Sequence, residues 1–163
     1  MKSPFIHIML IAIGVGCIAV SMYDVKYVEG SSMAPTLRHD DAVIIYRWAY
    51  GLQLPLVHHY LFRWGKVSPG ELVYLRDPVC MVPVVKRCAG AEDTLIIKRG
   101  GSIRVGEVQL MEKEIFESCI MDLYAIPEGK LFLLGDNRGI SFDSRHYGLV
   151  DEKRIEGRVV RFW

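Results

Sequence analysis

Cysteine and net charge are both scarce in this sequence, and each scarcity excludes a class of protein. Only four cysteines occur among the 163 residues, too few for a disulfide scaffold and without the CxxC or Cys/His spacing of a zinc site. The 20 basic and 19 acidic side chains nearly cancel to a net charge of +1, so nothing indicates a nucleic-acid partner. Because 51% of the residues are hydrophobic, intrinsic disorder is excluded, and the length favours one domain with at most a small appendage.

Charge is also absent from a long run near the N-terminus, where residues 3–23 hold no Asp, Glu, Lys or Arg. As a helix this run spans about 30 Å, the thickness of a bilayer core. We therefore predict a retained N-terminal transmembrane signal-anchor over residues 1–23 and one domain over residues 24–163. A cleaved signal peptide is the alternative, because Ala19 and Ser21 resemble a small-residue cleavage pattern. Lys2 precedes the run, so the positive-inside tendency places residues 24–163 outside the cytoplasm.

Beyond residue 24 the sequence is mainly β, with short runs of β-favouring residues separated by turn residues. We expect an antiparallel, partly closed β domain directly behind the anchor. Arg99-Gly-Gly-Ser102 is typical of a hairpin, and the only helical pattern in this region runs from Val108 to Leu123. The expected strands are Ala42–Tyr46, Glu71–Leu75, Val82–Val85, Thr94–Ile97, Ile103–Val105 and Lys130–Leu134.

The segment from Arg47 to Gly65 is long, aromatic and rich in turn residues, and it does not read as a regular strand. Its large apolar side chains can pack into the β core. They can equally rest at a membrane surface, because Trp and Tyr favour the bilayer interface and the predicted anchor is close in sequence. The sequence leaves both readings open.

Two segments contain residues suited to nucleophilic catalysis. Ser32 lies on a Gly-containing turn after the anchor, where a hydroxyl is accessible and backbone N–H groups are near. Lys86 ends the apolar run Met81–Val85, and apolar surroundings lower the pKa of a lysine until its neutral amine can deprotonate a serine. The ordinary alternatives are a simple turn and a strand-end lysine that reaches solvent.

A third segment, Gly135–Gly148, is dense in hydrogen-bonding groups and follows an apolar strand. Ser141 can orient a catalytic amine, and Asp143 with Arg145 can form a fixed ion pair. By itself the segment also fits a polar surface loop.

Together these segments resemble the type I signal peptidases, the membrane-bound Ser/Lys proteases of family S26 that remove signal peptides from exported preproteins. The similarity covers nearly the whole chain, and the motifs occur in the family's order. They are Gly30-Ser-Ser-Met-Ala-Pro-Thr36, Gly70–Pro78, Val85-Lys-Arg-Cys-Ala-Gly90, Ala125–Asn137 and Ser141-Phe-Asp-Ser-Arg145. The short span between the last two of these and the lysine motif implies a minimal accessory region.

The resemblance implies a role for each matching residue. Ser32 is the nucleophile, Lys86 is the general base, and Ser141 orients the lysine. Asp143 and Arg145 form a structural ion pair behind the site. No metal or cofactor is needed, because a serine, an amine and oxyanion donors complete the chemistry.

The oxyanion site and the substrate pocket are less fully defined by the motifs. The Ser32 backbone N–H is the expected oxyanion donor. Gly30 stands where some members carry a donating serine, so this chain lacks that side-chain donor. Met33 is expected to line the pocket, which in the family accepts small residues at the first and third positions before the cut.

The implied partners are the signal peptides of preproteins and the lipid bilayer. The predicted location is a bacterial cytoplasmic membrane, crossed once, with the catalytic domain on the extracytoplasmic face. Mitochondrial inner-membrane proteases share the motifs and stay an alternative. Two other functions stay open: a specialised processing protease with a dedicated substrate, of the pilus or conjugation type, and a catalytically silent, membrane-anchored binding domain.

Overall fold

The structure is a computed structural model that describes residues 7–9, 11, 21–54, 57–116 and 118–161. Most of the predicted anchor, residues 1–23, therefore lies outside the described residues. Those of its residues that are described at positions 7–9, 11, 21 and 22 are helical, and the first strand already begins at Tyr23. Within the described ranges, no helix has both the length and the apolar character needed to cross a bilayer.

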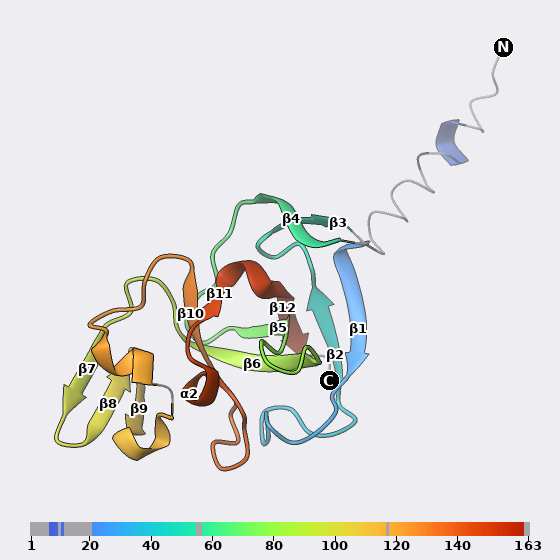
Figure 1. The fold of residues 1–163 in the computed structure, drawn as a ribbon. Coiled ribbons are helices and arrows are strands. Elements are labelled where there is room, and N and C mark those ends of the chain that lie inside the picture. Colours follow the sequence, from blue (N-terminus) through green and yellow to red (C-terminus); the bar gives the residue numbers. More distant parts are fainter. Residues whose placement is uncertain (1–6, 10, 12–20, 55–56, 117, 162–163) are drawn as a thin grey trace.

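An antiparallel, strongly curled sheet forms the body of the molecule (Figure 1), as expected from the strand-like runs. Its spatial order is β1-β2-β12-β5-β6-β10-β11. The bounds are β1 Tyr23–Tyr27, β2 Ala42–Tyr46, β12 Ile155–Arg161, β5 Leu72–Arg76, β6 Pro83–Gly90, β10 Lys130–Leu134 and β11 Val150–Asp151. The predicted strands at Ala42–Tyr46 and Lys130–Leu134 match residue for residue, whereas β6 runs five residues past the predicted end.

Alternating burial along the strands explains why this sequence forms a two-faced sheet. In β2, Val43 and Ile45 are buried while their neighbours are only partly covered. Val43 and Ile45 pack with Met33, Leu37 and other side chains in one apolar cluster. A second cluster, on the other face, includes Val73, Leu75, Cys88, Leu131 and Leu133. Two apolar clusters on opposite faces fix the register of the strands, because a one-residue slip would turn each strand's apolar side chains away from the cluster in which they pack.

A smaller three-stranded sheet projects from the body at the end opposite β1 (Figure 1). It consists of β7 Ile96–Arg99, β8 Ser102–Val105 and β9 Val108–Met111, and the predicted hairpin at Arg99–Ser102 joins the first two. We call this sheet the arm. It follows the strand of Lys86, where the sequence predicts a minimal accessory region.

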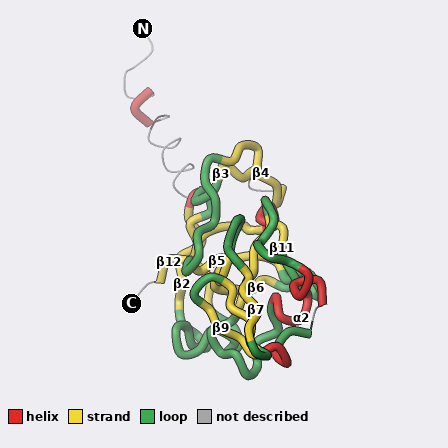
Figure 2. Tube along the Cα trace, turned by 90° about the vertical axis from the view of Figure 1, so that its left-hand side faces the viewer, coloured by secondary structure: helices red, strands yellow, loops and turns green. Residues whose placement is uncertain are grey.

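The predicted helix from Val108 to Leu123 is wrong. Its first four residues form β9, which pairs with β8, and the rest holds two short 3-10 helices, η1 Glu112–Glu114 and η2 Ser118–Asp122. The reason is visible in the burial pattern: Leu110 is buried between exposed Gln109 and Met111, a period of two rather than 3.6. Figure 2 shows how little helix the described residues from Tyr23 onward contain, since α2 Ser144–Tyr147 is also short.

The aromatic segment after Arg47 forms a separate two-stranded hairpin, β3 Gly51–Leu54 and β4 Val57–Arg63, beside the start of β1 (Figures 1 and 2). The core reading of this segment is confirmed for some of its residues, and the membrane-surface reading stays a prediction. Tyr50 is buried in the core, and the hydroxyl of Tyr60 donates to the carbonyl oxygen of Ile155 at 2.6 Å. Leu61, Phe62 and Trp64 are instead exposed, with more than half of each side chain open to solvent.

Candidate active site

Lys86 is a buried lysine in the middle of the sheet. It lies in β6 opposite Val73 of β5, and only 3% of it is exposed. Its Nζ donates to Ser141 Oγ at 2.9 Å. Burial lowers the pKa of Lys86 below its ordinary value, and the carboxylates of Asp143 and Asp77 oppose this shift without reversing it. A lysine with a lowered pKa can act as a base nearer to neutral pH.

Ser141, Asp143 and Arg145 form a compact polar group behind that amine. Arg145 binds Asp143 in a bidentate manner, with Nε 2.8 Å from Oδ1 and a terminal nitrogen 3.0 Å from Oδ2. Burial by itself raises the pKa of Asp143, but hydrogen bonds from Arg145, from the Gly135 amide and from Ser141 hold it below its usual range. Arg145 also donates to the carbonyl oxygen of Ser141 at 3.2 Å. The ion pair thus fixes the backbone of the residue that contacts Lys86.

Ser32 lies on an irregular turn between β1 and β2 and is partly exposed. Asn137 holds this turn from outside: its backbone N–H donates to the carbonyl oxygen of Ser32 at 3.0 Å, and its side chain donates to that of Ser31 at 3.2 Å. The described residues include no hydrogen bond between the Ser32 and Lys86 side chains. Catalytic hydrogen bonds often form only when substrate binds, so the lack of this bond in the free protein does not argue against a Ser32–Lys86 dyad.

Gly135 is the point at which the two halves of the site meet. A Cβ at this position would lie 2.5 Å from Ser141 Cβ and 2.6 Å from the carbonyl oxygen of Ser32, and closer still to Ser141 Oγ. Only a residue without a side chain allows both serines to approach this backbone. The structure therefore brings Ser32, Ser141 and Lys86, which are far apart in sequence, to one place.

The turn around Ser32 also defines which backbone groups can stabilise an oxyanion. Gly30 has φ +85°, and its N–H already donates to His39 Nδ1 at 3.2 Å. The N–H of Ser32 has no acceptor among the described residues. Met33 is buried directly beneath the turn, with 2% of its surface exposed. The arrangement leaves the Ser32 amide available to substrate and the Gly30 amide occupied.

Arg87 is a supporting residue to which the sequence analysis gave no role. Its guanidinium binds Asp136 through two hydrogen bonds of 2.8 and 2.7 Å and donates to the Gly70 carbonyl oxygen at 2.9 Å. It also reaches Thr36 Oγ1 at 3.5 Å. Each partner lies in a different family motif, so one side chain ties these motifs together. The signal was present in the adjacent Lys-Arg pair, but spacing alone does not say which acid the arginine meets.

The segment directly after the arm provides a second support for the candidate site, which the sequence analysis did not predict. The Phe116 N–H donates to the carbonyl oxygen of Arg145 at 2.7 Å, and Glu114 lies 3.6 Å from the Arg145 guanidinium. The Phe116 ring stacks on His146, with the ring centroids 4.6 Å apart. The segment after the arm therefore covers the loop that carries Ser141. The sequence pattern from Val108 to Leu123 predicts a helix, so it does not indicate this contact.

A groove of about 670 Å³ opens beside Ser32 on the concave face of the sheet. Its lining includes apolar residues, among them Met33, which follows Ser32, Val43, and Val85, which precedes Lys86. The other lining residues are Lys26, Tyr27, Val28, Glu29, Arg47, Tyr74, Arg76, Val82, Pro83, Val84 and Glu156. Within the described part of the chain, His, Cys, Asp and Glu form no group of three able to hold a metal ion.

Comparison with known proteins identifies the family of this chain. The family model described as "Signal peptidase, peptidase S26" matches residues 2–163. The chain belongs to the signal peptidase family, peptidase S26. Its enzymatic class is accordingly that of a serine endopeptidase that removes signal peptides from preproteins.

Relatives of this signal peptidase occur in plastids and in bacteria. Thylakoidal processing peptidase 1 of Arabidopsis thaliana is 32% identical over 142 residues, which cover 85% of this chain and 41% of that protein. Signal peptidase I of Leptolyngbya laminosa is 29% identical over 147 residues, which cover 86% of this chain and 68% of that protein. A crystal structure of signal peptidase I from Enterococcus faecalis is 24% identical, with a TM-score of 0.43, and covers 59% of this chain and 98% of that one.

Proposed function

We propose that this signal peptidase cuts preproteins with Ser32 as nucleophile and Lys86 as general base, at the surface of the membrane that holds the substrate. The observation that supports this most strongly is the environment of Lys86. Its amine is buried and donates a hydrogen bond to Ser141 Oγ. Ser141 in turn lies against the Gly135 backbone, which also meets the carbonyl oxygen of Ser32. A buried amine of lowered pKa beside an accessible serine is the arrangement that base-activated nucleophilic catalysis requires.

The reaction runs in two steps. The neutral amine of Lys86 takes the proton from Ser32 Oγ as that oxygen attacks the scissile carbonyl carbon, and the Ser32 N–H stabilises the oxyanion. The tetrahedral intermediate collapses, Lys86 gives the proton to the leaving amine, and an acyl-enzyme is left. Lys86 then takes a proton from water as the water oxygen attacks the ester carbonyl carbon. The bond from that carbon to Ser32 Oγ breaks, Lys86 returns the proton to Ser32 Oγ, and the signal peptide leaves with a new carboxyl group. Ser141 holds the amine in place throughout.

The substrate is proposed to bind as an additional strand along β6. Residues Pro83–Lys86 pair with β5 on one side, whereas β10 pairs with β6 only from Arg87 onward. The second edge of Pro83–Lys86 is therefore open to an extended peptide, which would gain main-chain hydrogen bonds there. The side chains that face the floor meet the apolar lining residues Met33 and Val85. A narrow apolar floor favours small residues at the first and third positions before the cut.

The membrane-facing surface is proposed to include the hairpin β3–β4. The hairpin lies beside the start of β1 (Figure 1), and Leu61, Phe62 and, directly after β4, Trp64 are exposed. Such large apolar side chains suit the lipid interface. A single-pass anchor over residues 1–23 in a bacterial cytoplasmic membrane is part of this proposal, with residues 24–163 on the extracytoplasmic face. Its support is the uncharged run and the bacterial relatives.

The hairpin placement can be tested in the full chain reconstituted into vesicles that contain brominated lipids. Bromine quenches tryptophan only at contact depth, so wild-type emission should fall. The Trp64→Phe variant should lose most of that quenching, because Trp48 lies closer to the core. Equal fractional quenching in both proteins would contradict the placement.

The function is tested by incubating the detergent-solubilised protein with several unrelated preproteins, with Ser32→Ala as the blank. Cleavage of many preproteins after small residues is the expected result. Cleavage of a single preprotein would instead indicate a specialised processing protease with a dedicated substrate. Cleavage of none would leave a catalytically silent binding domain and overturn the proposal.

A further inference from the structure

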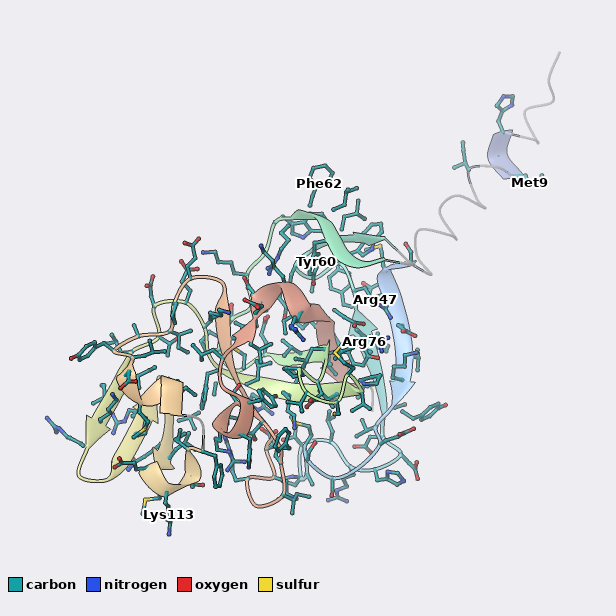
Figure 3. The ribbon with its side chains drawn as sticks, viewed as in Figure 1. Met9, Arg47, Tyr60, Phe62, Arg76 and Lys113 are labelled. Carbon is teal, nitrogen blue, oxygen red and sulfur yellow. The ribbon has the colours of Figure 1, made fainter. Side chains whose placement is uncertain are left out.

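The groove lining also includes charged residues that the dyad chemistry does not use, and several of them form ion pairs with one another or with Asp24. Lys26 lies 3.3 Å from Asp24, and Arg47 lies 2.9 Å from the same carboxylate. Arg47 also lies 3.9 Å from Glu156, whose other oxygen is 3.2 Å from Arg76 Nε. Figure 3 labels Arg47 and Arg76, which lie near each other beside β1 on either side of this carboxylate.

Glu156 is the buried centre of these ion pairs, with 4% of its surface exposed. A buried carboxylate requires counter-charges, and here two arginines supply them. The contact with Glu156 also fixes the orientation of Arg76, whose side chain is 39% exposed. Among the described residues, the two terminal nitrogens of Arg76 have no acceptor. Arg76 thus presents an oriented guanidinium, with free donors, to the lumen of the groove.

The strand register locates Arg76 relative to the cut. Arg76 pairs with Pro83, and Tyr74 pairs with Val85, so these side chains share the groove face. Pro83 precedes Lys86 by three residues, about 10 Å along a strand. In an extended substrate every second side chain faces the floor. The first and third positions before the cut then face the apolar lining residues, and the fifth, about 13 Å from the first, comes within reach of the Arg76 guanidinium.

We propose that Arg76 is a specificity-determining residue that binds a substrate carboxylate at the fifth position before the cut. This inference rests on the proposed function above. Lys26 and Arg47 are both paired with Asp24, so among the basic residues that line the groove Arg76 is the one whose terminal nitrogens are left for a substrate carboxylate. A lysine at that substrate position would meet a like charge. An apolar residue would cover the guanidinium without giving it an acceptor, which costs free energy. The favoured substrates are therefore preproteins with Asp or Glu shortly before the cleavage motif.

The test uses the full chain in detergent and three peptide substrates that differ only at the fifth position before the cut, which is Glu, Gln or Lys. The measured quantity is kcat/KM for each peptide. Wild type should prefer Glu to Lys by about fivefold, the size of one partly exposed ion pair. Raising the salt concentration should reduce that ratio, because the contact is screened.

Variants distinguish Arg76 from a general effect of charge. Arg76→Gln should bring the Glu-to-Lys ratio of kcat/KM close to one, and Arg76→Glu should reverse the preference. Arg104→Glu is the matched control, because Arg104 is exposed on β8 in the arm, away from this groove, and it should keep the wild-type ratio.

Three results would overturn the inference. Equal kcat/KM for all three peptides in wild type rejects the role of Arg76 and leaves the peptidase assignment intact. If wild type cuts no peptide above the Ser32→Ala blank, the proposed function fails, and this inference fails with it. An unchanged ratio in a folded Arg76→Gln protein also rejects the inference.

Discussion

Ser32, the proposed nucleophile, and Lys86, the proposed base, occupy opposite kinds of environment. Lys86 sits within an eight-residue strand and is 3% exposed, whereas Ser32 lies on an irregular turn and is partly open to the groove. The difference follows from what each group must do. A lysine becomes a base only where the protein disfavours its charged form, and a serine that attacks a polypeptide must be reachable by that polypeptide.

The two environments share one support, the loop that follows β10. Gly135 and Asn137 contact the Ser32 turn, while Ser141 contacts the amine of Lys86. The buried pair of Asp143 and Arg145 fixes the loop. Changes to either group test the chemistry, and changes to the loop test how the two groups are held together.

The largest effect is expected from replacing either reacting group. Ser32→Ala removes the nucleophile, and Lys86→Arg substitutes a guanidinium that stays charged at any accessible pH. Each change should lower kcat by a factor of about 10⁴ or more, and the double variant should be little worse than either single one, because the two groups act as a unit. Single-turnover cleavage of a preprotein measures this. Substantial activity in folded Ser32→Ala would remove Ser32 from the mechanism.

A large loss of stability is expected from breaking the buried ion pair. Asp143→Asn leaves the buried Arg145 guanidinium with only the longer contact to Glu114 as a counter-charge, which should cost about 3 kcal/mol in the free energy of unfolding. Asp151→Asn is the control, because its pair with Lys130 is exposed and should contribute less than about 1 kcal/mol. Urea unfolding compares the two proteins. Equal losses would contradict the structural role given to the buried pair.

The pH dependence of stability should follow the same pair. The pKa of Asp143 is lower in the folded protein than its ordinary value, so its ionised form stabilises the fold at neutral pH. That contribution is lost as the pH falls through the folded-state pKa. The Asp143→Asn protein should therefore lose less stability on acidification than wild type does.

A smaller, more local effect is expected from the glycine at which the two halves meet. Gly135→Ala places a Cβ against Ser141 and the Ser32 carbonyl, so it should separate the two serines and lower kcat/KM by about 100-fold. Gly139→Ala, four residues later in the same loop, meets no atom within 4 Å and should change kcat/KM by less than about twofold. The measurement compares the kcat/KM of the two variants. Similar kcat/KM values for Gly135→Ala and Gly139→Ala would contradict the close contact of Gly135 with the two serines.

Much of the site could be predicted from the sequence because its residues lie in short motifs with fixed spacing. These motifs predict that Ser32 lies on a turn, that Lys86 ends an apolar run and that Asp143 pairs with Arg145, two residues later. The curled antiparallel sheet also followed, since β2 and β10 match the predicted runs. The catalytic roles of Ser32 and Lys86 stay predictions, which the variants above address.

The parts that could not be predicted depend on contacts between distant residues. Arg87 and Asp136 are 49 positions apart, and only the folded sheet shows that they pair. The Val108–Leu123 segment has apolar residues compatible with either period, and pairing with β8 decided for a strand in its first part. In the aromatic segment, the position of β4 against η3 Glu152–Arg154 decides which rings are buried, and composition alone does not contain that information.

The pH dependence of kcat/KM tests the central claim, that a buried neutral lysine is the base, most directly. Protonated Lys86 cannot accept the Ser32 proton, so activity should fall as the pH drops through the pKa of Lys86. Because burial lowers that pKa, the acidic limb should lie below 10.5, the ordinary value for lysine. The measurement uses one preprotein with alanine before the cut, over a pH range in which the protein stays folded. A limb at or above 10.5 would contradict the account.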